Sequence, residues 1–478
     1  MYHRSTTSTW PCVQPVLLVF CLKAHTLRLV SPFASVTLRP PISAYTDELM
    51  ATAPSHCPDE LVPDSPELQR IIHWVKSDRH ANAFLVLQND KILVEEYFNG
   101  RRKEDKSDVF SVSKSVVSLL IGIAAQKELV ALDNPISYYT RPNETWSQTS
   151  RERESKITVS HVLQMTCGLD DEMKYVAPPG TRWHYNLGTA WHMLKEVIEG
   201  ASKLPMQTVA DAWLFKKLGI SPIFQPRSGG SKVFDLVKAY VQNYYQDMIR
   251  NYSLSPINIA VAFIYSAYRK TGSRLLHFVS SYMTMFLLLA IKDGYSMYRK
   301  YSGARKYFKT PTTSLHCSGM DCIRLGQLVL HNGRHPTTNE QIVEKAYIDT
   351  CKSATLQRLN PSYSNMFWLN GKGKHINPTT IFSRVDPPVI HEDLVPTAPQ
   401  DMISFMGYNT QRIYVVPSLN IVVVRLGDED SDGATAAKSP FDNRLWEMLM
   451  ELFHKMQAGR KQSRGRSLTI QATMANKL

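Results

Sequence analysis

The sequence predicts an α+β fold, in which an antiparallel sheet built from both ends of the chain is flanked by helices, with a mainly helical subdomain between. Two observations indicate the sheet: one strand pair lies at 83–98 and a second at 403–425. A third indicates the subdomain, because apolar residues recur at helical spacing over much of 111–220. The 478 residues, 43% hydrophobic and 20% charged, are enough to bury a large core.

The first ordered elements are a helix and a β-hairpin. Glu67–Val75 has apolar residues at helical spacing, which predicts the helix. Ala83–Leu87 and Ile92–Phe98 predict two strands, and Gln88–Lys91 between them has the polar composition of a hairpin turn. Before them, residues 1–64 are rich in Pro, Ser and Thr towards their end and predict an N-terminal extension.

A buried helix follows, starting at Ser111. From Val116 to Ala124 it is almost wholly apolar, and a helix that is apolar all round lies in a protein core. Lys114 stands three residues after Ser111, so both side chains share one face and the amine can reach the hydroxyl. The helix N-terminus and burial both disfavour a cation, so we expect Lys114 to act as a base towards Ser111.

Two non-catalytic alternatives apply to this pair. Ser111 could be an ordinary N-cap, and Lys114 a first-turn side chain that extends its charge into solvent. A Ser-x-x-Lys pattern is frequent by chance, so it carries little weight alone.

The remaining elements alternate between helices and strands. Gly168 and Gly219 follow two of the helices and predict where they end. Pro178–Gly188 predicts a turn-rich loop that leads into the next helix. The predicted helices are 157–166, 189–199, 211–217, 319–330 and 441–456, and 403–416 predicts a strand and hairpin whose partner is 421–425.

Several segments carry a family resemblance in a fixed order. They are Phe110–Ser115, Ile157–Leu169, Pro179–Asn186, Asn360–Asn370 and Ala398–Met402 continuing to Gly427. In these segments the chain resembles the serine β-lactamase and penicillin-binding-protein superfamily, in the class C-like branch that holds 6-aminohexanoate-dimer hydrolases and related esterases. The resemblance covers about 65–230 and 313–455, and it implies a β-lactamase/transpeptidase-like fold.

The resemblance implies the roles of the site residues. Ser111 is the expected acylated nucleophile, Lys114 its base partner and Tyr185 a second proton-transfer group. Asn186 is expected to orient the leaving group, although Leu187 stands where the family has a small residue. Gly407 lets substrate approach the backbone, and the N–H groups of Ser111 and Tyr408 are the expected oxyanion donors.

One departure from the family bears on the substrate. β-Lactamases carry Lys-Thr-Gly on the strand beside the site, whose cation binds the substrate carboxylate, whereas this chain has Phe405–Gly407. The uncharged strand favours a small neutral ester or amide over penicillins. We expect neither a metal ion nor a cofactor in the reaction.

The net charge of +13 is concentrated in two segments. Residues 231–312 carry +9 and the tail from Lys455 carries +6, which leaves −2 for the rest. The hydrolase part is therefore near neutral, and nucleic acid is not an expected partner. Within 251–291 two uncharged runs of 18 and 17 residues flank Arg269, Lys270 and Arg274, so membrane association through this stretch is one interpretation.

These observations predict four segments. They are an N-terminal extension (1–64), a serine hydrolase domain (65–456), a basic, Tyr-rich insertion within it (227–312) and a basic tail (457–478). The insertion could be a lid, a membrane hairpin or a spurious segment such as translated intron. Val16–Leu22 is only weakly signal-like, so the chain is compatible with the cytoplasm or with secretion.

The predicted function is serine hydrolysis through a Ser111 acyl-enzyme. The alternative is a catalytically inactive relative that serves as a binding protein or a membrane-associated scaffold. Seven scattered cysteines do not suggest a disulfide framework. The close pair Cys317 and Cys322, beside His316, lacks further ligands at zinc-site spacing, so we expect ordinary core cysteines.

Overall fold

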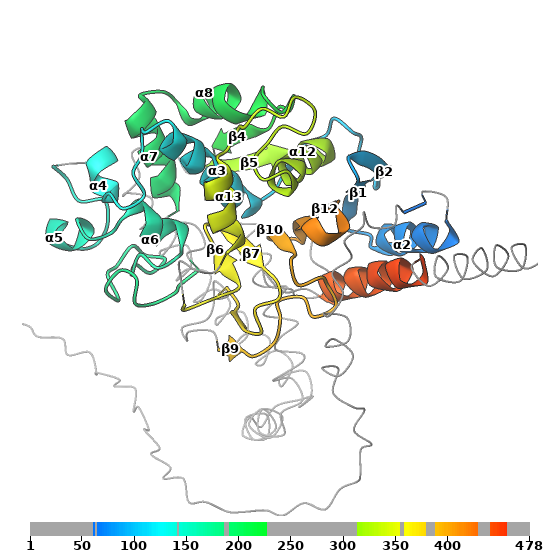
Figure 1. The fold of residues 1–478 in the computed structure, drawn as a ribbon. Coiled ribbons are helices and arrows are strands. Elements are labelled where there is room, and N and C mark those ends of the chain that lie inside the picture. The colour runs from blue at the N-terminus through cyan, green and yellow to red at the C-terminus, as the bar shows by residue number, and fades with distance from the viewer. Residues whose placement is uncertain are drawn as a thin grey trace, which may run out of the picture. The chain divides into compact units, whose positions relative to one another are not determined.

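One seven-stranded sheet forms the centre of the protein (Figure 1). The computed structural model describes residues 61–62, 65–140, 143–185, 191–226, 313–353, 358–378, 388–428 and 440–456. The strand order is β2-β1-β12-β11-β10-β7-β6, and every neighbouring pair is antiparallel. The strands are β1 (Ala81–Gln88), β2 (Lys91–Tyr97), β6 (Tyr363–Ser364), β7 (Phe367–Leu369), β10 (Ile403–Gly407), β11 (Gln411–Val416) and β12 (Ile421–Gly427).

The sheet joins distant parts of the chain through β1 and β12. Their register runs from Ala81 opposite Gly427 to Gln88 opposite Ile421. Every residue of β1 and β12 is buried, as expected for strands with both faces covered. The predicted antiparallel sheet with strands from both ends of the chain is confirmed.

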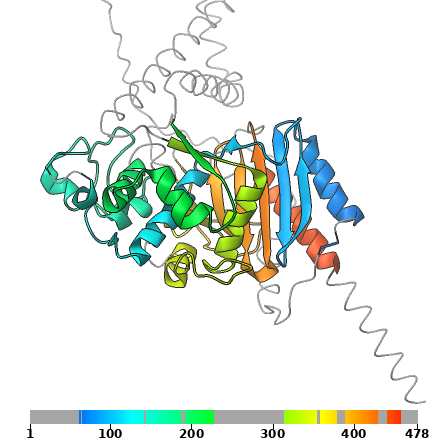
Figure 2. The same ribbon diagram turned by 90° about the horizontal axis from the view of Figure 1, so that it is seen from above.

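Helices cover both faces of this sheet (Figure 2). On one side lie α2 (Pro66–Ser77) and the helix of residues 440–456, which contact each other through the stacked rings of Trp74 and Phe441, 5.0 Å apart. On the other side α12 (Gly319–Leu330) packs on β1, β11 and β12. Gly326 permits that approach, because a Cβ there would lie 2.5 Å from the Val422 side chain and 2.9 Å from that of Ile413.

The helical subdomain lies beside α12 and is centred on α3 (Val112–Gln126). All thirteen residues from Val112 to Ala124 are buried, as the apolar run predicted. Helix α7 packs against α3, and also against α4 and α8. The other helices here are α4 (Ile136–Tyr139), α5 (Arg151–Glu154), α6 (Val159–Leu163), α7 (His192–Ser202) and α8 (Met206–Ala210).

Two predicted helices differ from the structure. The helix expected at 157–166 is only the five-residue α6, because Met165 takes a left-handed conformation (φ +57°) that ends it. The helix expected at 211–217 begins earlier, as α8, and continues into a π-helix at Asp211–Phe215. Gly219 (φ +62°) follows it, as predicted.

A second, three-stranded sheet was not predicted. It has the order β3-β5-β4, and β4 pairs with β5 up to Pro226 opposite Thr313. The chain therefore leaves β4 and re-enters β5 at paired positions, which are the two ends of the predicted insertion 227–312. The strands are β3 (Ser107–Asp108), β4 (Ile223–Pro226) and β5 (Thr313–Cys317).

The remaining described elements are short. They are α13 (Lys345–Lys352), the strand pair β8 (His375–Ile376) and β9 (Val389–Ile390), and a 3-10 turn at Pro417–Leu419. Leu61 belongs to the predicted extension, yet it is buried and its amide donates to Gln88 Oε1 at 2.8 Å. The insertion 227–312, its stretch 251–291 and the tail 457–478 lie outside the described residues. Within the described residues, no helix combines the length and apolar character needed to cross a membrane.

Candidate active site

The turn before α3 is held in place by β3 and β5. Asp108 Oδ1 accepts hydrogen bonds from the Phe110 amide (2.9 Å) and from the Ser314 hydroxyl. The Val109 amide donates to the Leu315 carbonyl at 3.0 Å. These bonds support a left-handed Phe110 (φ +48°), a conformation that is costly for a bulky residue and persists only when its surroundings enforce it.

Ser111 follows this turn and faces Lys114. Lys114 Nζ donates to Ser111 Oγ at 3.0 Å, and the Lys114 residue is only 2% exposed. Ser111 occupies the N-cap position of α3, but its side chain makes no cap hydrogen bond there. Both non-catalytic alternatives are therefore wrong: the Ser111 hydroxyl is not a cap, and the Lys114 amine does not extend into solvent.

Tyr185 reaches the same point from the loop before α7. It is 1% exposed, its hydroxyl lies near the Ser111 side chain, and Lys114 Nζ lies 4.8 Å from its ring centroid. Burial raises the pKa of Tyr185 well above its ordinary value, although the nearby Ser111 side chain and the positive charge of Arg412 oppose the rise. Tyr185 is therefore a neutral phenol near neutral pH and can donate a proton.

Aromatic rings surround the Lys114–Tyr185 pair. Trp183, Tyr363 and Trp368 lie with ring centroids 6.2, 5.9 and 5.6 Å from that of Tyr185. Trp191 places its ring centroid 5.1 Å from Lys114 Nζ, within the range of a cation–π contact. None of these four aromatic residues was predicted as part of the site. Trp183 and Trp368 lie in two of the segments that carry the family resemblance. The aromatic residues in those segments were the signal that could have identified them.

The end of β10 touches the nucleophile turn through backbone atoms. A Cβ built on Gly407 would lie 3.3 Å from the Ser111 amide nitrogen and would overlap the Val109 carbonyl oxygen. The Tyr408 ring packs edge-on against Phe110, with centroids 5.7 Å apart. The structure thus brings Gly407 and Tyr408 beside Ser111. Asn186, the other predicted site residue, lies outside the described residues.

The strand residues before Gly407 carry no charge to the site. Phe405 and Met406 are both buried, and the Phe405 ring packs against that of Phe367 with centroids 4.9 Å apart. This part of β10 therefore has an aromatic ring within the core and no charged side chain.

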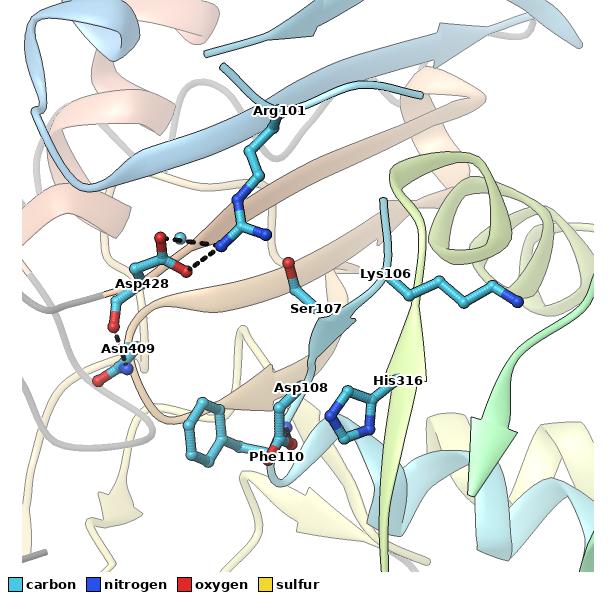
Figure 3. Close-up of a pocket in the computed structure, with 9 residues that line it drawn as sticks. Arg101, Lys106, Ser107, Asp108, Phe110, His316, Asn409 and Asp428 are labelled. Atoms are coloured by element: carbon cyan, nitrogen blue, oxygen red, sulfur yellow. Dashed lines mark hydrogen bonds and ion pairs between the residues drawn. The ribbon is translucent and has the colours of Figure 1, made fainter. Parts of the chain in front are cut away.

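A pocket of about 250 Å³ borders the other side of the nucleophile turn (Figure 3). An ion pair between Arg101 and Asp428 (3.1 Å) lies at one end of it, and Asn409 donates to the carbonyl of Asp428. Ser111 is not among the lining residues, although its neighbour Phe110 is. The lining residues are Arg101, Lys106, Ser107, Asp108, Phe110, His316, Asn409, Gly427 and Asp428.

Comparison with known families agrees with this geometry. Residues 51–226 match the family described as beta-lactamase. The chain has a β-lactamase-like fold. The predicted resemblance to the serine β-lactamase and penicillin-binding-protein superfamily is confirmed, and with it the predicted fold class. No curated protein sequence matches the chain.

Several solved structures resemble the chain at low sequence identity. A penicillin-binding-protein homologue from Caulobacter crescentus is 12% identical, covers 82% of this chain and 99% of its own, and superposes with a TM-score of 0.50. A protein assigned as a β-lactamase from Bacteroides dorei is 14% identical, with coverages of 82% and 98% and a TM-score of 0.49. A protein assigned as a 6-aminohexanoate-dimer hydrolase from Bacillus anthracis is 15% identical, with coverages of 81% and 82% and a TM-score of 0.48.

Proposed function

We propose that the protein is a serine hydrolase that cleaves a small neutral ester or amide through an acyl-enzyme on Ser111. The observation that carries the proposal is the 3.0 Å contact between Lys114 Nζ and Ser111 Oγ at the start of a buried helix, with the Tyr185 side chain near the same pair. A serine hydroxyl is a weak nucleophile until a base contacts it, and Lys114 is such a base.

Acylation follows from this geometry. Ser111 Oγ attacks the substrate carbonyl carbon and its proton passes to Lys114 Nζ, which is already within hydrogen-bond distance. The amides of Ser111 and Tyr408 hold the oxyanion. When the tetrahedral intermediate collapses, Tyr185 gives its proton to the leaving group and recovers one from the Lys114 ammonium. A water molecule then attacks the acyl-enzyme, with the same groups working in reverse.

Two features stabilise the charge that Lys114 acquires. The Trp191 and Tyr185 rings lie 5.1 and 4.8 Å from Lys114 Nζ, and aromatic faces attract a cation. The neutral Tyr185 remains protonated at the pH of the reaction, so it is ready to protonate an alkoxide or amine as it departs.

The uncharged β10 strand supports a neutral substrate. Phe405 and Met406 offer no cation to a carboxylate, so penicillins lose the contact that β-lactamases give them. We expect p-nitrophenyl esters of short acids to be hydrolysed faster than penicillins at equal concentration.

The decisive experiment is fluorophosphonate labelling together with p-nitrophenyl acetate turnover by the full chain. We expect the unmodified protein to be labelled and active, and Ser111→Ala to be neither. Ser115→Ala is the matched control one turn further along α3: it loses a buried hydrogen bond to the Met366 carbonyl but leaves the reacting atoms in place. If the unmodified protein is neither labelled nor active, the proposal fails and the inactive binding or scaffold protein is favoured.

A further inference from the structure

Two buried arginines donate hydrogen bonds to the turn that joins β10 to β11. We propose that Arg412, assisted by Arg425, positions the Tyr408 N–H group as an oxyanion donor. The inference rests on the proposed function and deepens it, because it assigns positioning residues to the same site.

Arg412 contacts the turn at both of its ends. Its Nη1 donates to the Gly407 carbonyl at 2.8 Å and to the Gln411 carbonyl at 3.1 Å. Its other nitrogens are fixed by Asp442 of the helix 440–456, with Nε–Oδ1 and Nη2–Oδ2 distances of 3.0 and 3.2 Å. Tyr414 adds a hydroxyl donor to the same carboxylate at 2.5 Å. Arg412 is 0% exposed and Asp442 1%, so this arrangement is shielded from water.

Arg425 donates hydrogen bonds to the middle of the turn. Its Nη1 donates to the carbonyls of Asn409 (2.8 Å) and Thr410 (3.2 Å), the two left-handed residues of the turn. Its Nη2 contacts Asp78, just after α2, at 2.5 Å. Together the two guanidinium groups bind the carbonyls of every residue from Gly407 to Gln411 except Tyr408.

This arrangement is unfavourable as a simple stabilising device. Arg412 and Arg425 lie directly opposite each other in the register of β11 and β12, and like charges facing each other across strands repel. Buried ion pairs also lose hydration, so well-packed apolar residues in their place are often equally or more stable. Stability alone therefore does not explain two buried arginines on one turn, whereas a need to orient its peptide groups does.

The orientation follows from peptide geometry. The carbonyl of Gly407 and the N–H of Tyr408 belong to one peptide group, which is trans because the described chain has no cis bond. In a planar trans peptide the two groups point in opposite directions. When Arg412 holds the carbonyl on the side of β11, the Tyr408 N–H is directed to the opposite edge of β10.

Charge adds to this orientation. A cation bound to the carbonyl polarises the peptide and makes its N–H a stronger hydrogen-bond donor. The Arg412 charge also extends to the centre of the site, since it opposes the burial-driven rise in the pKa of Tyr185. Arg412 thus orients the Tyr408 N–H group and also places a positive charge near the point where the oxyanion develops.

The test must separate catalysis from folding, because removing one partner of a buried pair is strongly destabilising. We therefore replace both partners, Arg412→Met with Asp442→Leu, in the full chain and measure the melting temperature together with kcat and KM for p-nitrophenyl acetate. The matched control is Arg444→Ala, which breaks an exposed pair with Glu447 on the same helix. Arg412→Lys, with Asp442 retained, keeps the charge but loses the planar fork.

We expect the double variant to keep a melting temperature near that of the unmodified protein and to lose about 10- to 100-fold in kcat, with KM little changed. Arg412→Lys should recover part of that loss, and Arg444→Ala should lose nothing. A stable double variant with unchanged kcat would overturn the inference and leave the proposed function standing. An unmodified protein no more active than Ser111→Ala would overturn both.

Discussion

Gly407 is the residue at which β10 meets the nucleophile turn, and its lack of a side chain is a requirement of that contact. We expect Gly407→Ala to push the strand away from Val109 and Ser111, because its Cβ would overlap the Val109 carbonyl oxygen. A displacement of about 1 Å at an oxyanion donor costs about 100-fold in rate. The measurement is kcat/KM for p-nitrophenyl acetate, with the melting temperature recorded alongside.

Ser404→Ala is the control on the same strand. The Ser404 hydroxyl is buried and has no hydrogen-bond partner among the described residues, so its loss should leave activity unchanged. If Gly407→Ala retains full kcat/KM, the close approach of β10 to Ser111 has no catalytic importance.

Individual site residues differed in how far sequence could predict them. Ser111 and Lys114 share a helix, so their separation follows from local geometry, and Tyr185 was placed by resemblance. Arg412 was hidden because its sequence context is that of an ordinary strand, and only the pairing of β11 with β12 and the helix 440–456 reveals that it is buried. Contacts between segments far apart in the chain leave no periodic signal.

At the scale of elements, the β4–β5 hairpin carries the next prediction. Pro226 and Thr313 are paired, so the two strands can be closed by a two-residue turn. We expect replacement of 227–312 by Asn-Gly, which suits a tight hairpin turn, to leave the fold and the esterase activity intact. A shorter loop also costs less entropy to close, by about 0.6 kcal/mol for each halving of a flexible loop. Melting temperature and p-nitrophenyl acetate turnover are the measurements.

A longer deletion, 227–317, provides the contrast. It removes β5 and with it the Leu315 and Ser314 contacts that hold the nucleophile turn, so this variant should lose activity. If the shorter deletion is insoluble or inactive while the intact chain is active, 227–312 is part of the hydrolase and not an insertion into it.

The second sheet has weaker sequence signals than the elements that were predicted. The helix at 319–330 and the strands at 83–98 were predicted because their apolar periodicity is complete within each segment. Strand β3 has only two residues, and β4 and β5 are separated by the predicted insertion, so neither has a neighbouring turn signal. The π-helix at Asp211–Phe215 is likewise a deviation within a helical pattern, which apolar spacing alone does not distinguish from a regular helix.

For the whole molecule, buried thiols and phenols predict a loss of stability at alkaline pH. Burial raises the pKa of Cys167 to about 11 and that of Cys351 to about 12, and it raises the pKa values of Tyr347, Tyr363 and Tyr414 well above the ordinary range. These groups keep their protons in the folded chain at a pH where the unfolded chain releases them.

The sign of the effect follows from this difference. The contribution of the cysteines to stability is fully present below about pH 8.5, where their thiols are protonated in both the folded and the unfolded state. It declines as the pH rises towards the pKa values of the folded state. Each such group contributes a slope of about 1.4 kcal/mol per pH unit to the free energy of unfolding. Urea unfolding between pH 7.5 and 10.5 measures it.

Cys351→Ala supplies the internal comparison. In this variant the free energy of unfolding should decline less steeply with pH, because one titrating thiol is missing. This difference does not depend on the stability of the variant at pH 7.5. A free energy of unfolding that stays constant from pH 8 to pH 10.5 in the parent protein would contradict the burial of these groups.

The pairing of β1 with β12 has a consequence for synthesis on the ribosome. The nucleophile helix leaves the exit tunnel early, whereas Gly407, Arg412 and Asp442 are translated far later. A nascent chain therefore contains Ser111 and Lys114 before strand β10, which completes the proposed site, has been made. The hydrolase we propose therefore becomes competent only after residues 407–442 have been translated, and we expect a chain that stops before Gly407 to be inactive.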